Sequence, residues 1–387
     1  MKRLRNYLLI AFFCLTSLLP VGAQQKAALP AETIKQVEAL IASERERLKI
    51  PGLSIAIAVN HQLVYAKGFG LADIEHNVAA KPETAYRTAS IAKSLTATAV
   101  MQLAERGKLD LDAPIQKYCP AFPEKPWPIT VRQLLGHLGG IRHYAKPGEA
   151  SGTEHFFTLT DSLKIFKDDP LLSQPGTKFN YTTYGYSLLG CAIEGASGMT
   201  YEAYMQEYVF KPAGMPNTAL DNAYVIIPNR ARGYTRLSQS AYAQLPAEAK
   251  KLAKVGDLFN ASLHDTSMKV PGGGLVSTAV DLVNFALAMD NAKLVKRETT
   301  QQMWTQQRTP DGKETGYGLG WGVIDADGKK MVSHSGGQAG TSTNLMLIPG
   351  QGLVIAIMCN LDGASPGPLT IKIRDLLLTL PGSSRTQ

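Results

Sequence analysis

Segments with the composition of β-strands stand at both ends of this chain of 387 residues, and mainly helical sequence separates them. Near the start, two apolar runs are joined by Asn60-His61-Gln62, which is typical of a short hairpin. Near the end, short strands are separated by turns at Asp327-Gly328 and at 349–352. The predicted strands cover residues 53–59, 63–69, 318–324, 330–334, 343–348 and 353–358. We therefore expect an α/β protein of the α+β type, with one antiparallel sheet built from both chain ends, flanking helices and an inserted, mainly helical lobe.

Helical patterns surround this sheet and fill the lobe, which we place at about residues 85–280. Apolar spacing predicts a first helix over 31–48, ended by Pro51-Gly52, and a last helix over 369–380. Within the lobe, helices are expected at 130–135, 159–166, 184–196, 201–209 and 279–289, the last capped by Ser277 or Thr278. Residues 234–270 are more polar and lack periodicity, so they form either a surface excursion or a lid over the cleft between sheet and lobe.

The first residues have the pattern of a processing signal. Three basic residues, Lys2, Arg3 and Arg5, precede an apolar stretch over 7–19 and small residues that end at Ala23. This order is typical of a secretory signal peptide that is cleaved after Ala23. We expect a signal peptide at 1–23, one folded domain at 24–387 and a protein exported to the periplasm or secreted. No later segment has the length of a membrane helix.

Charge and cysteine content exclude several classes of protein. Without the signal segment, 40 − 3 = 37 Lys and Arg oppose 32 Asp and Glu, a net charge of +5, and these charges are scattered. A nucleic-acid interface is therefore not supported. Three cysteines remain, Cys119, Cys191 and Cys359, so at most one disulfide can form and stability must come from a core. No His-Glu-x-x-His or paired-cysteine motif occurs, and we expect no metal or organic cofactor.

Ser90-Ile91-Ala92-Lys93 carries the strongest chemical signal. Lys93 is the only charged residue in the run from Ile91 to Leu103, and a helix that is apolar on nearly all sides is a buried helix. Burial disfavours the ammonium form, so the pKa of Lys93 is expected to fall far enough for its free amine to deprotonate Ser90, one turn away. The structural alternative is a lysine that extends to solvent from the start of a helix.

Two later segments supply candidate partners. Tyr181 follows the turn at Pro175-Gly176, and its hydroxyl near a lysine can relay a proton; alone, it reads as a packed aromatic. His334-Ser335-Gly336-Gly337 ends a predicted edge strand, where glycines allow an extended acyl substrate to pair with the backbone. The amides of Gly337 and Ser90 are candidate oxyanion donors. Alone, His334 reads as an ordinary partly buried histidine.

The ordered set of motifs resembles a known family. Ser-x-x-Lys, the tyrosine segment and His-x-Gly occur with Leu134-Leu135-Gly136-His137-Leu138-Gly139-Gly140 and a glycine-rich segment at 271–279 between them. This order resembles the serine β-lactamase-like hydrolases: class C β-lactamases, D-alanyl-D-alanine carboxypeptidases, related esterases and, closest in pattern, the LACTB-type branch. The resemblance implies Ser90 as the acylated nucleophile, Lys93 as its base and Tyr181 as proton relay. It also implies His334 with Gly336 as counterpart of the usual Lys-Thr-Gly strand.

Two departures from the family pattern affect the expected substrate. Thr183 stands where the family usually has asparagine, which removes an amide donor, and His334 replaces a lysine, which removes a permanent positive charge. Both favour a peptidase or esterase over an efficient β-lactamase. Arg142 and His143 are candidates for replacement charge, or else a pair in an exposed loop. We expect an exported serine hydrolase that forms an acyl-enzyme with a small-molecule or peptide substrate; the alternative is a catalytically weak or inactive binding or scaffold protein of the same fold.

Overall fold

The computed structural model describes residues 28–146, 148–150, 152–326 and 329–380. The predicted signal peptide at 1–23 lies outside the described residues. The helices are α1 (Ala31–Leu48), α2 (Ala92–Glu105), α3 (Val131–Leu135), α4 (Leu159–Ser162), α5 (Tyr184–Ser197), α6 (Tyr201–Met205), α7 (Lys211–Ala213), α8 (Gln239–Gln244), α9 (Ala247–Leu252), α10 (Val270–Gly273), α11 (Ala279–Asp290), α12 (Arg297–Met303) and α13 (Gly367–Leu378). Among the described residues, no helix is long and apolar enough to cross a membrane.

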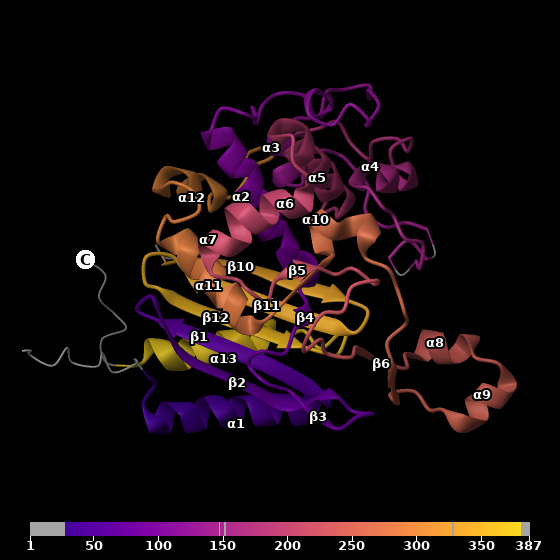
Figure 1. Ribbon diagram of the computed structural model, residues 1–387, viewed down its shortest axis with the longest axis vertical. Helices are drawn as coiled ribbons and strands as arrows, with labels where there is room; N and C mark the ends of the chain where they lie inside the picture. The colour runs from indigo at the N-terminus through magenta and orange to yellow at the C-terminus, as the bar shows by residue number, and fades with distance from the viewer. Residues whose placement is uncertain (1–27, 147, 151, 327–328, 381–387) are drawn as a thin grey trace, which may run out of the picture.

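Seven antiparallel strands form the main sheet, in the order β3-β2-β1-β12-β11-β10-β9 (Figure 1). Three come from the start of the chain: β1 (Gly52–Val59), β2 (Gln62–Asp73) and β3 (Val78–Ala79). Four come from its end: β9 (Gly322–Ala326), β10 (Lys329–Gln338), β11 (Thr341–Ile348) and β12 (Leu353–Cys359). The two groups join where Leu53 of β1 pairs with Cys359 of β12. The predicted fold class, an antiparallel sheet made from both chain ends, is confirmed.

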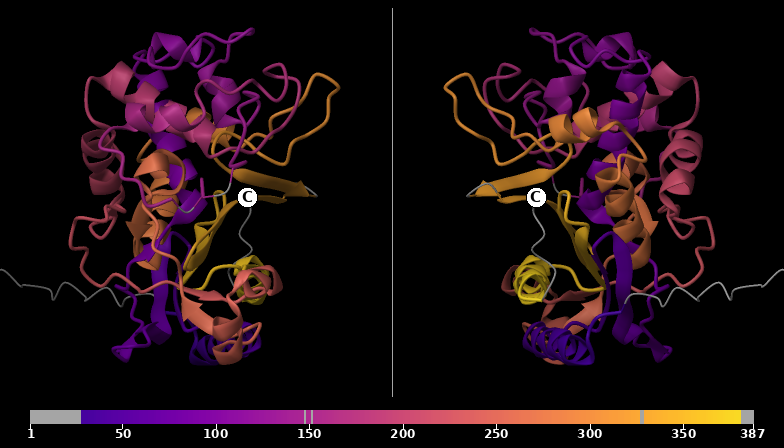
Figure 2. Two further views of the ribbon diagram at one scale, coloured as in Figure 1. Left: turned by 90° about the vertical axis from the view of Figure 1, so that its right-hand side faces the viewer. Right: turned by 90° about the vertical axis from the view of Figure 1, so that its left-hand side faces the viewer.

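Both faces of this sheet are covered, which explains why the central strands β11 and β12 are buried along their whole length (Figure 2). Along β1, the larger side chains Leu53, Ile55 and Ile57 belong to the core beneath α1 and α13. The alternate residues Ala56 and Ala58 belong to the core shared with the lobe. The first helix has the expected bounds. The last begins two residues before its predicted start, because a proline is tolerated in the first turn of a helix.

The lobe is organised around α2, whose residues from Ala92 to Leu103 are all buried. This helix packs against α5 and α10, and a disulfide between Cys119 and Cys191 ties α5 to the segment that follows α2. Cys359 is a buried free thiol. The predicted helix at 201–209 is divided, because α6 ends at Met205 and a wider π-helical turn covers Gln206–Phe210. Thr278 caps α11 through the Asp281 amide.

The polar segment 234–270 is mostly a surface excursion and not a lid. Two short strands, β6 (Tyr234–Arg236) and β7 (Leu258–Asn260), carry α8 and α9 out beside the end of the sheet (Figure 1). The Arg236 guanidinium donates to the carbonyl of Lys49, just beyond α1, which fixes this arm on the side away from the lobe. The final part of the segment returns to the lobe through the short 3₁₀ turn η5 (Ser267–Lys269).

Candidate active site

Ser90 lies in a tight turn that connects a small sheet to α2. The 3₁₀ turn η1 (Ala89–Ile91) follows β4 (Tyr86–Arg87), which pairs with β8 (Leu275–Ser277); β5 (Ala219–Leu220) pairs on the other side of β8. The Thr88 amide donates to the Leu275 carbonyl at 2.8 Å. Ala89 has φ +47°, a left-handed conformation that costs a non-glycine residue energy and is common at functional sites. The turn therefore holds Ser90, which is half-buried, in one fixed place.

Lys93 is fully buried (0% exposed) directly behind Ser90. Its Nζ lies 3.1 Å from Ser90 Oγ, 3.2 Å from Thr183 Oγ1 and 2.7 Å from the Gly272 carbonyl oxygen. A neutral amine has two N–H donors and one lone pair. The carbonyl can only accept, and Thr183 can accept, so the two donors are used and the lone pair is left for the Ser90 hydroxyl. The predicted approach of Ser90 and Lys93 is present.

Burial determines the charge state of Lys93. Loss of solvation lowers the pKa of Lys93 well below its ordinary value, and the nearby positive charge of Lys269 lowers it further. The rings of Tyr181 and Tyr186, at 4.9 and 5.7 Å from Nζ, favour the ammonium form. A cation–π contact contributes about 0.5–2 kcal/mol, whereas burying an ammonium costs several kcal/mol. Desolvation therefore dominates and favours the neutral amine more strongly than in an exposed lysine.

Tyr181 contacts the same hydroxyl from another side. It hydrogen-bonds Ser90, but burial is the larger effect and raises the pKa of the Tyr181 phenol above its ordinary value. The phenol is thus protonated when the neighbouring amine is not. Thr183, two residues on, accepts a hydrogen bond from Lys93. The structure therefore brings four of the predicted residues, Ser90, Lys93, Tyr181 and Thr183, into one cluster.

His334 is buried on β10 and both of its ring nitrogens have partners. Nδ1 lies 2.7 Å from the Ser335 carbonyl, which can only accept, so Nδ1 carries the proton. Nε2 then accepts from the Tyr317 hydroxyl at 2.8 Å. Burial, with the Lys93 charge as a smaller cause, lowers the pKa of His334 to about 3. His334 is therefore neutral at pH 7.

The glycines after His334 have different surroundings. A Cβ on Gly336 would lie 2.5 Å from the Thr88 carbonyl and 3.0 Å from Ala89 Cβ, so only glycine lets β10 pack against the turn that carries Ser90. A Cβ on Gly337 would meet nothing within 4 Å. Strand β9 pairs with β10 only as far as Ser333, whereas β11 pairs with it to Gln338. Within the described chain, residues 335–338 thus have a strand neighbour on one side only.

Four further residues lie at the site, and the sequence analysis had suggested a role there for only one of them, His143 as replacement charge. His137 is buried with φ +58°, accepts the Thr182 amide at Nδ1, and leaves Nε2 without a partner among the described residues. The Tyr317 ring contacts the rings of both His137 and His334. In the sequence, the flanking glycines of Gly316-Tyr317-Gly318 were the only feature that set Tyr317 apart. His143 accepts the Thr183 amide, and burial lowers its pKa to about 4. Lys269, just before the glycine-rich segment, is the fourth.

The sequence suggested Arg142 and His143 as a replacement source of positive charge, and this prediction is wrong. Arg142 is an internal ion-pair residue, bound to Glu149 at 2.8 Å and to Asp169 at 2.5 Å. His143 is neutral near pH 7 because burial and the neighbouring lysines lower its pKa. Neither residue supplies free positive charge to the cleft.

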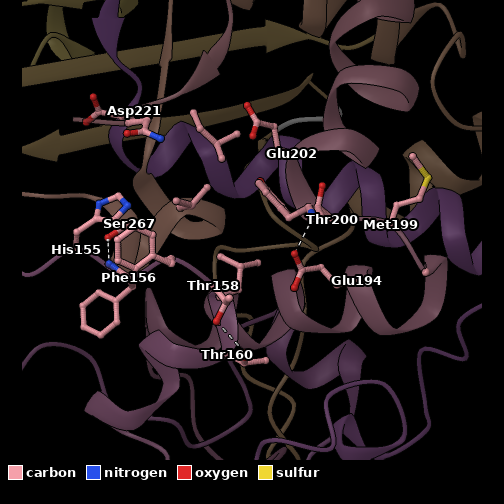
Figure 3. A pocket seen from close by; sticks show the side chains of 17 residues that line it. His155, Phe156, Thr158, Thr160, Glu194, Met199, Thr200, Glu202, Asp221 and Ser267 are labelled. Carbon is pink, nitrogen blue, oxygen red and sulfur yellow. Dashed lines mark hydrogen bonds between the residues drawn. The ribbon is translucent and has the colours of Figure 1, made fainter. Parts of the chain in front are cut away.

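A separate cavity of about 670 Å³ is bordered by Ser267 of η5 and Val270 of α10 (Figure 3). It is lined by His155, Phe156, Glu194, Met199, Ser267 and others, and it includes neither Ser90 nor Lys93. Its size is therefore no argument for the chemistry of the serine–lysine pair. Among the described residues, no group of three or more His, Cys, Asp or Glu side chains is arranged to hold a metal ion.

The sheet with helices on both faces, and the lobe beside it, define the fold of penicillin-binding proteins and β-lactamases. A match over residues 37–378 shows that the chain belongs to the Beta-lactamase family, as the sequence motifs predicted. It is 30% identical to the human serine beta-lactamase-like protein LACTB, mitochondrial, over 89% of this chain and 79% of that protein. It is 29% identical to the putative penicillin-binding protein PbpX of Bacillus subtilis, over 92% and 85%.

Among solved structures, the octameric penicillin-binding protein homologue from Pyrococcus abyssi superposes with a TM-score of 0.73. The two are 28% identical, and the match covers 89% of this chain and 77% of that one. The family and these relatives support a serine β-lactamase-like hydrolase in general terms.

Proposed function

We propose that this protein is a serine hydrolase that acts on amide or ester substrates through an acyl-enzyme on Ser90. The observation that carries this proposal is the buried Lys93 amine, 3.1 Å from Ser90 Oγ. The pair supplies what a serine needs to attack an acyl group, a base that is unprotonated near neutral pH and within hydrogen-bonding distance.

In the acylation step, Ser90 Oγ bonds to the substrate carbonyl carbon and its proton passes to Lys93 Nζ. The π electrons of the carbonyl move to its oxygen, which becomes an oxyanion. We assign its two donors to the backbone amides of Ser90 and Gly337. The exposed position of Gly337 and the free edge of β10 support this assignment, because they leave room for an extended acyl chain.

Collapse of the tetrahedral intermediate expels an amine or alkoxide, which must gain a proton. We assign the delivery to Tyr181, because its phenol is protonated and bonded to Ser90. The phenol gives its proton to the leaving group and takes one from the Lys93 ammonium, which restores both residues. Water then attacks the ester of Ser90 and Lys93 accepts its proton. When the tetrahedral intermediate collapses, the acid is released and the Lys93 ammonium returns that proton to Ser90 Oγ, which restores both residues.

The neutral state of His334 bears on the kind of substrate. In the family pattern a lysine stands here, and its permanent charge suits a substrate carboxylate. His334 offers no charge at pH 7, and its two nitrogens already bond Tyr317 and Ser335. Thr183 is occupied by Lys93 and offers no amide to a substrate carbonyl. We propose a peptidase or esterase in preference to an efficient β-lactamase.

We also propose that the protein is exported to the periplasm or secreted. The charged and then apolar segment before Ala23 supports this. The disulfide between Cys119 and Cys191 is a second support, because such bonds persist mainly in oxidising compartments.

The proposal is tested by mass spectrometry of the intact protein after treatment with a fluorophosphonate and, separately, with a penicillin. A fluorophosphonate adduct on Ser90 that disappears in both Ser90→Ala and Lys93→Ala supports the acyl-enzyme mechanism. An exposed-lysine variant, Lys108→Met, controls for general effects of removing an amine. No adduct with either probe in the wild-type protein would contradict the proposal and favour the binding or scaffold alternative.

The substrate class is tested by comparing an ester, a D-amino-acid peptide and a cephalosporin at equal concentration. We expect ester or peptide turnover to exceed cephalosporin turnover. The reverse ranking would contradict the interpretation of Thr183 and His334.

A further inference from the structure

The site contains a second buried lysine, Lys269, which the acylation mechanism does not use. It ends η5 and is only 3% exposed. A Cβ atom on Gly273 would lie within 4 Å of both Lys269 Cδ and the Ala89 carbonyl. Lys269 therefore runs beside the peptide that precedes Ser90. Its ammonium lies 5.6 Å from the centre of the Tyr144 ring, and the Tyr144 hydroxyl bonds Thr183, the partner of Lys93.

Among the described residues, Lys269 has few hydrogen-bond partners for a buried ammonium. Of its three N–H donors, one reaches the Ala150 carbonyl at a long 3.3 Å. In the described part of the chain, no carboxylate lies within ion-pairing distance of it. The nearby acid Asp265 is bound at 2.7 Å to His155 and at 2.7 Å to the Ser267 amide. A buried cation with unused donors and no counter-ion is costly, and an anion in the site would offset that cost.

The environment of Lys269 has a net positive charge at neutral pH. Burial and the Arg87 charge lower the pKa of Lys269 to about 8, so most of it is still ammonium at pH 7. The other groups that face it are Lys93, His143 and His264, and its charge lowers the pKa of all three. They are neutral, while Arg87 is paired with Asp221 at 2.7 Å. Among the described residues, Lys269 thus carries a buried positive charge that no carboxylate pairs.

We propose that Lys269 binds an anionic group of the substrate, so that the preferred substrates are esters or amides with a carboxylate close to the scissile bond. This inference rests on the proposed acylation of Ser90. Gly336 of β10 and Gly273 of α10 both approach Ala89. Lys269, at the end of η5, thereby supplies the cation that β10 lacks at His334. The site then recognises a substrate carboxylate at Lys269, and no longer at the position of His334.

The test uses the mono-4-nitrophenyl esters of glutaric and adipic acid, each paired with its carboxamide analogue, which has the same length and no charge. For the wild-type protein we expect kcat/KM for the acid to exceed that for the amide by about ten- to a hundred-fold, the range of a charge-assisted hydrogen bond. In Lys269→Met the ratio of kcat/KM for the acid to that for the amide should fall to about one, because any change in the Lys93 pKa affects both substrates alike. Lys269→Arg should retain most of the wild-type ratio. Lys108→Met serves as the exposed-lysine control.

A second measurement needs no variant. Free glutarate should slow fluorophosphonate labelling of wild-type Ser90, while glutaramide at equal concentration should not. If the wild-type protein turns over both esters without preference, or Lys269→Met keeps the preference, the role of Lys269 is contradicted and the acylation chemistry stands. If neither ester acylates Ser90 and no labelling occurs, the proposed function itself fails.

Discussion

Lys93 Nζ lies 3.1 Å from Ser90 Oγ, and Lys93 has no exposed surface. Its remaining contacts, to Thr183 and to the Gly272 carbonyl, use the two donors of a neutral amine and leave the lone pair for the serine. These contacts are compatible with a neutral amine, and burial is the effect that favours it by lowering the pKa of Lys93.

The first prediction concerns the pH dependence of Ser90 labelling. Because the free amine is the reactive form, the rate of fluorophosphonate labelling should rise with pH through the lowered pKa of Lys93. The Lys269 charge helps to lower that pKa, so removing it in Lys269→Met should move the rising limb to higher pH. Lys108→Met should leave the limb in place. A limb that moves to lower pH in Lys269→Met would contradict this electrostatic coupling.

The second prediction concerns Thr183. Thr183→Val keeps the shape of the side chain and removes the hydroxyl that accepts from Lys93. With one partner lost and the amine less well held, we expect labelling of Ser90 to slow by roughly five- to fifty-fold. Thr183→Ser, which keeps the hydroxyl, should stay within about three-fold of wild type. Equal rates in the two variants would show that Thr183 does not position the amine.

Much of this arrangement could be predicted from the chain alone. The first helix has the expected bounds because its apolar spacing and the Pro51-Gly52 stop are local signals. Ser90 in η1 and Lys93 at the start of α2 are also local, because they are three residues apart. Lys269 could not be predicted, because it reaches the site only when α10 packs against α2 and η1, contacts between segments about 180 residues apart. Tyr317 was missed for the same reason.

The third prediction compares two adjacent glycines. A methyl group on Gly336 would collide with the Thr88 carbonyl and with Thr343 Oγ1, so Gly336→Ala should push β10 away from Ser90. We expect a loss of about 1–3 kcal/mol in unfolding free energy, measured by chemical denaturation, together with slower labelling. Gly337→Ala has open space and should unfold at the wild-type denaturant concentration. Equal destabilisation of both variants would contradict the close approach at Gly336.

The fourth prediction concerns stability in acid. Burial lowers the pKa of His143 and of His264 to about 4, and that of His334 to about 3. Between pH 6.5 and about 4 the unfolded chain binds protons at these histidines and the folded protein does not. Stability from their neutral burial is therefore complete above pH 6.5 and is lost as pH falls toward 3.

This loss is measured as the melting temperature against pH. In His334→Asn the decrease in melting temperature between pH 7 and 4.5 should be smaller than in wild type. The difference should be about 2–4 °C for each kcal/mol of pH-dependent stability that His334 contributes. His76→Asn, at an exposed site, serves as the control and should follow the wild-type curve. A His334→Asn curve with the wild-type slope would show that His334 is not held neutral by burial.

The central claim is that the Lys93 amine is neutral at physiological pH, and NMR of lysine labelled with ¹³C at Cε measures this most directly. The Lys93 signal is identified by its absence in Lys93→Arg and followed from pH 5 to 11. We predict a free-amine chemical shift at pH 7 and a titration midpoint far below those of the exposed lysines. A Lys93 signal that stays in the ammonium position at pH 7 and moves only with the exposed lysines would contradict the account.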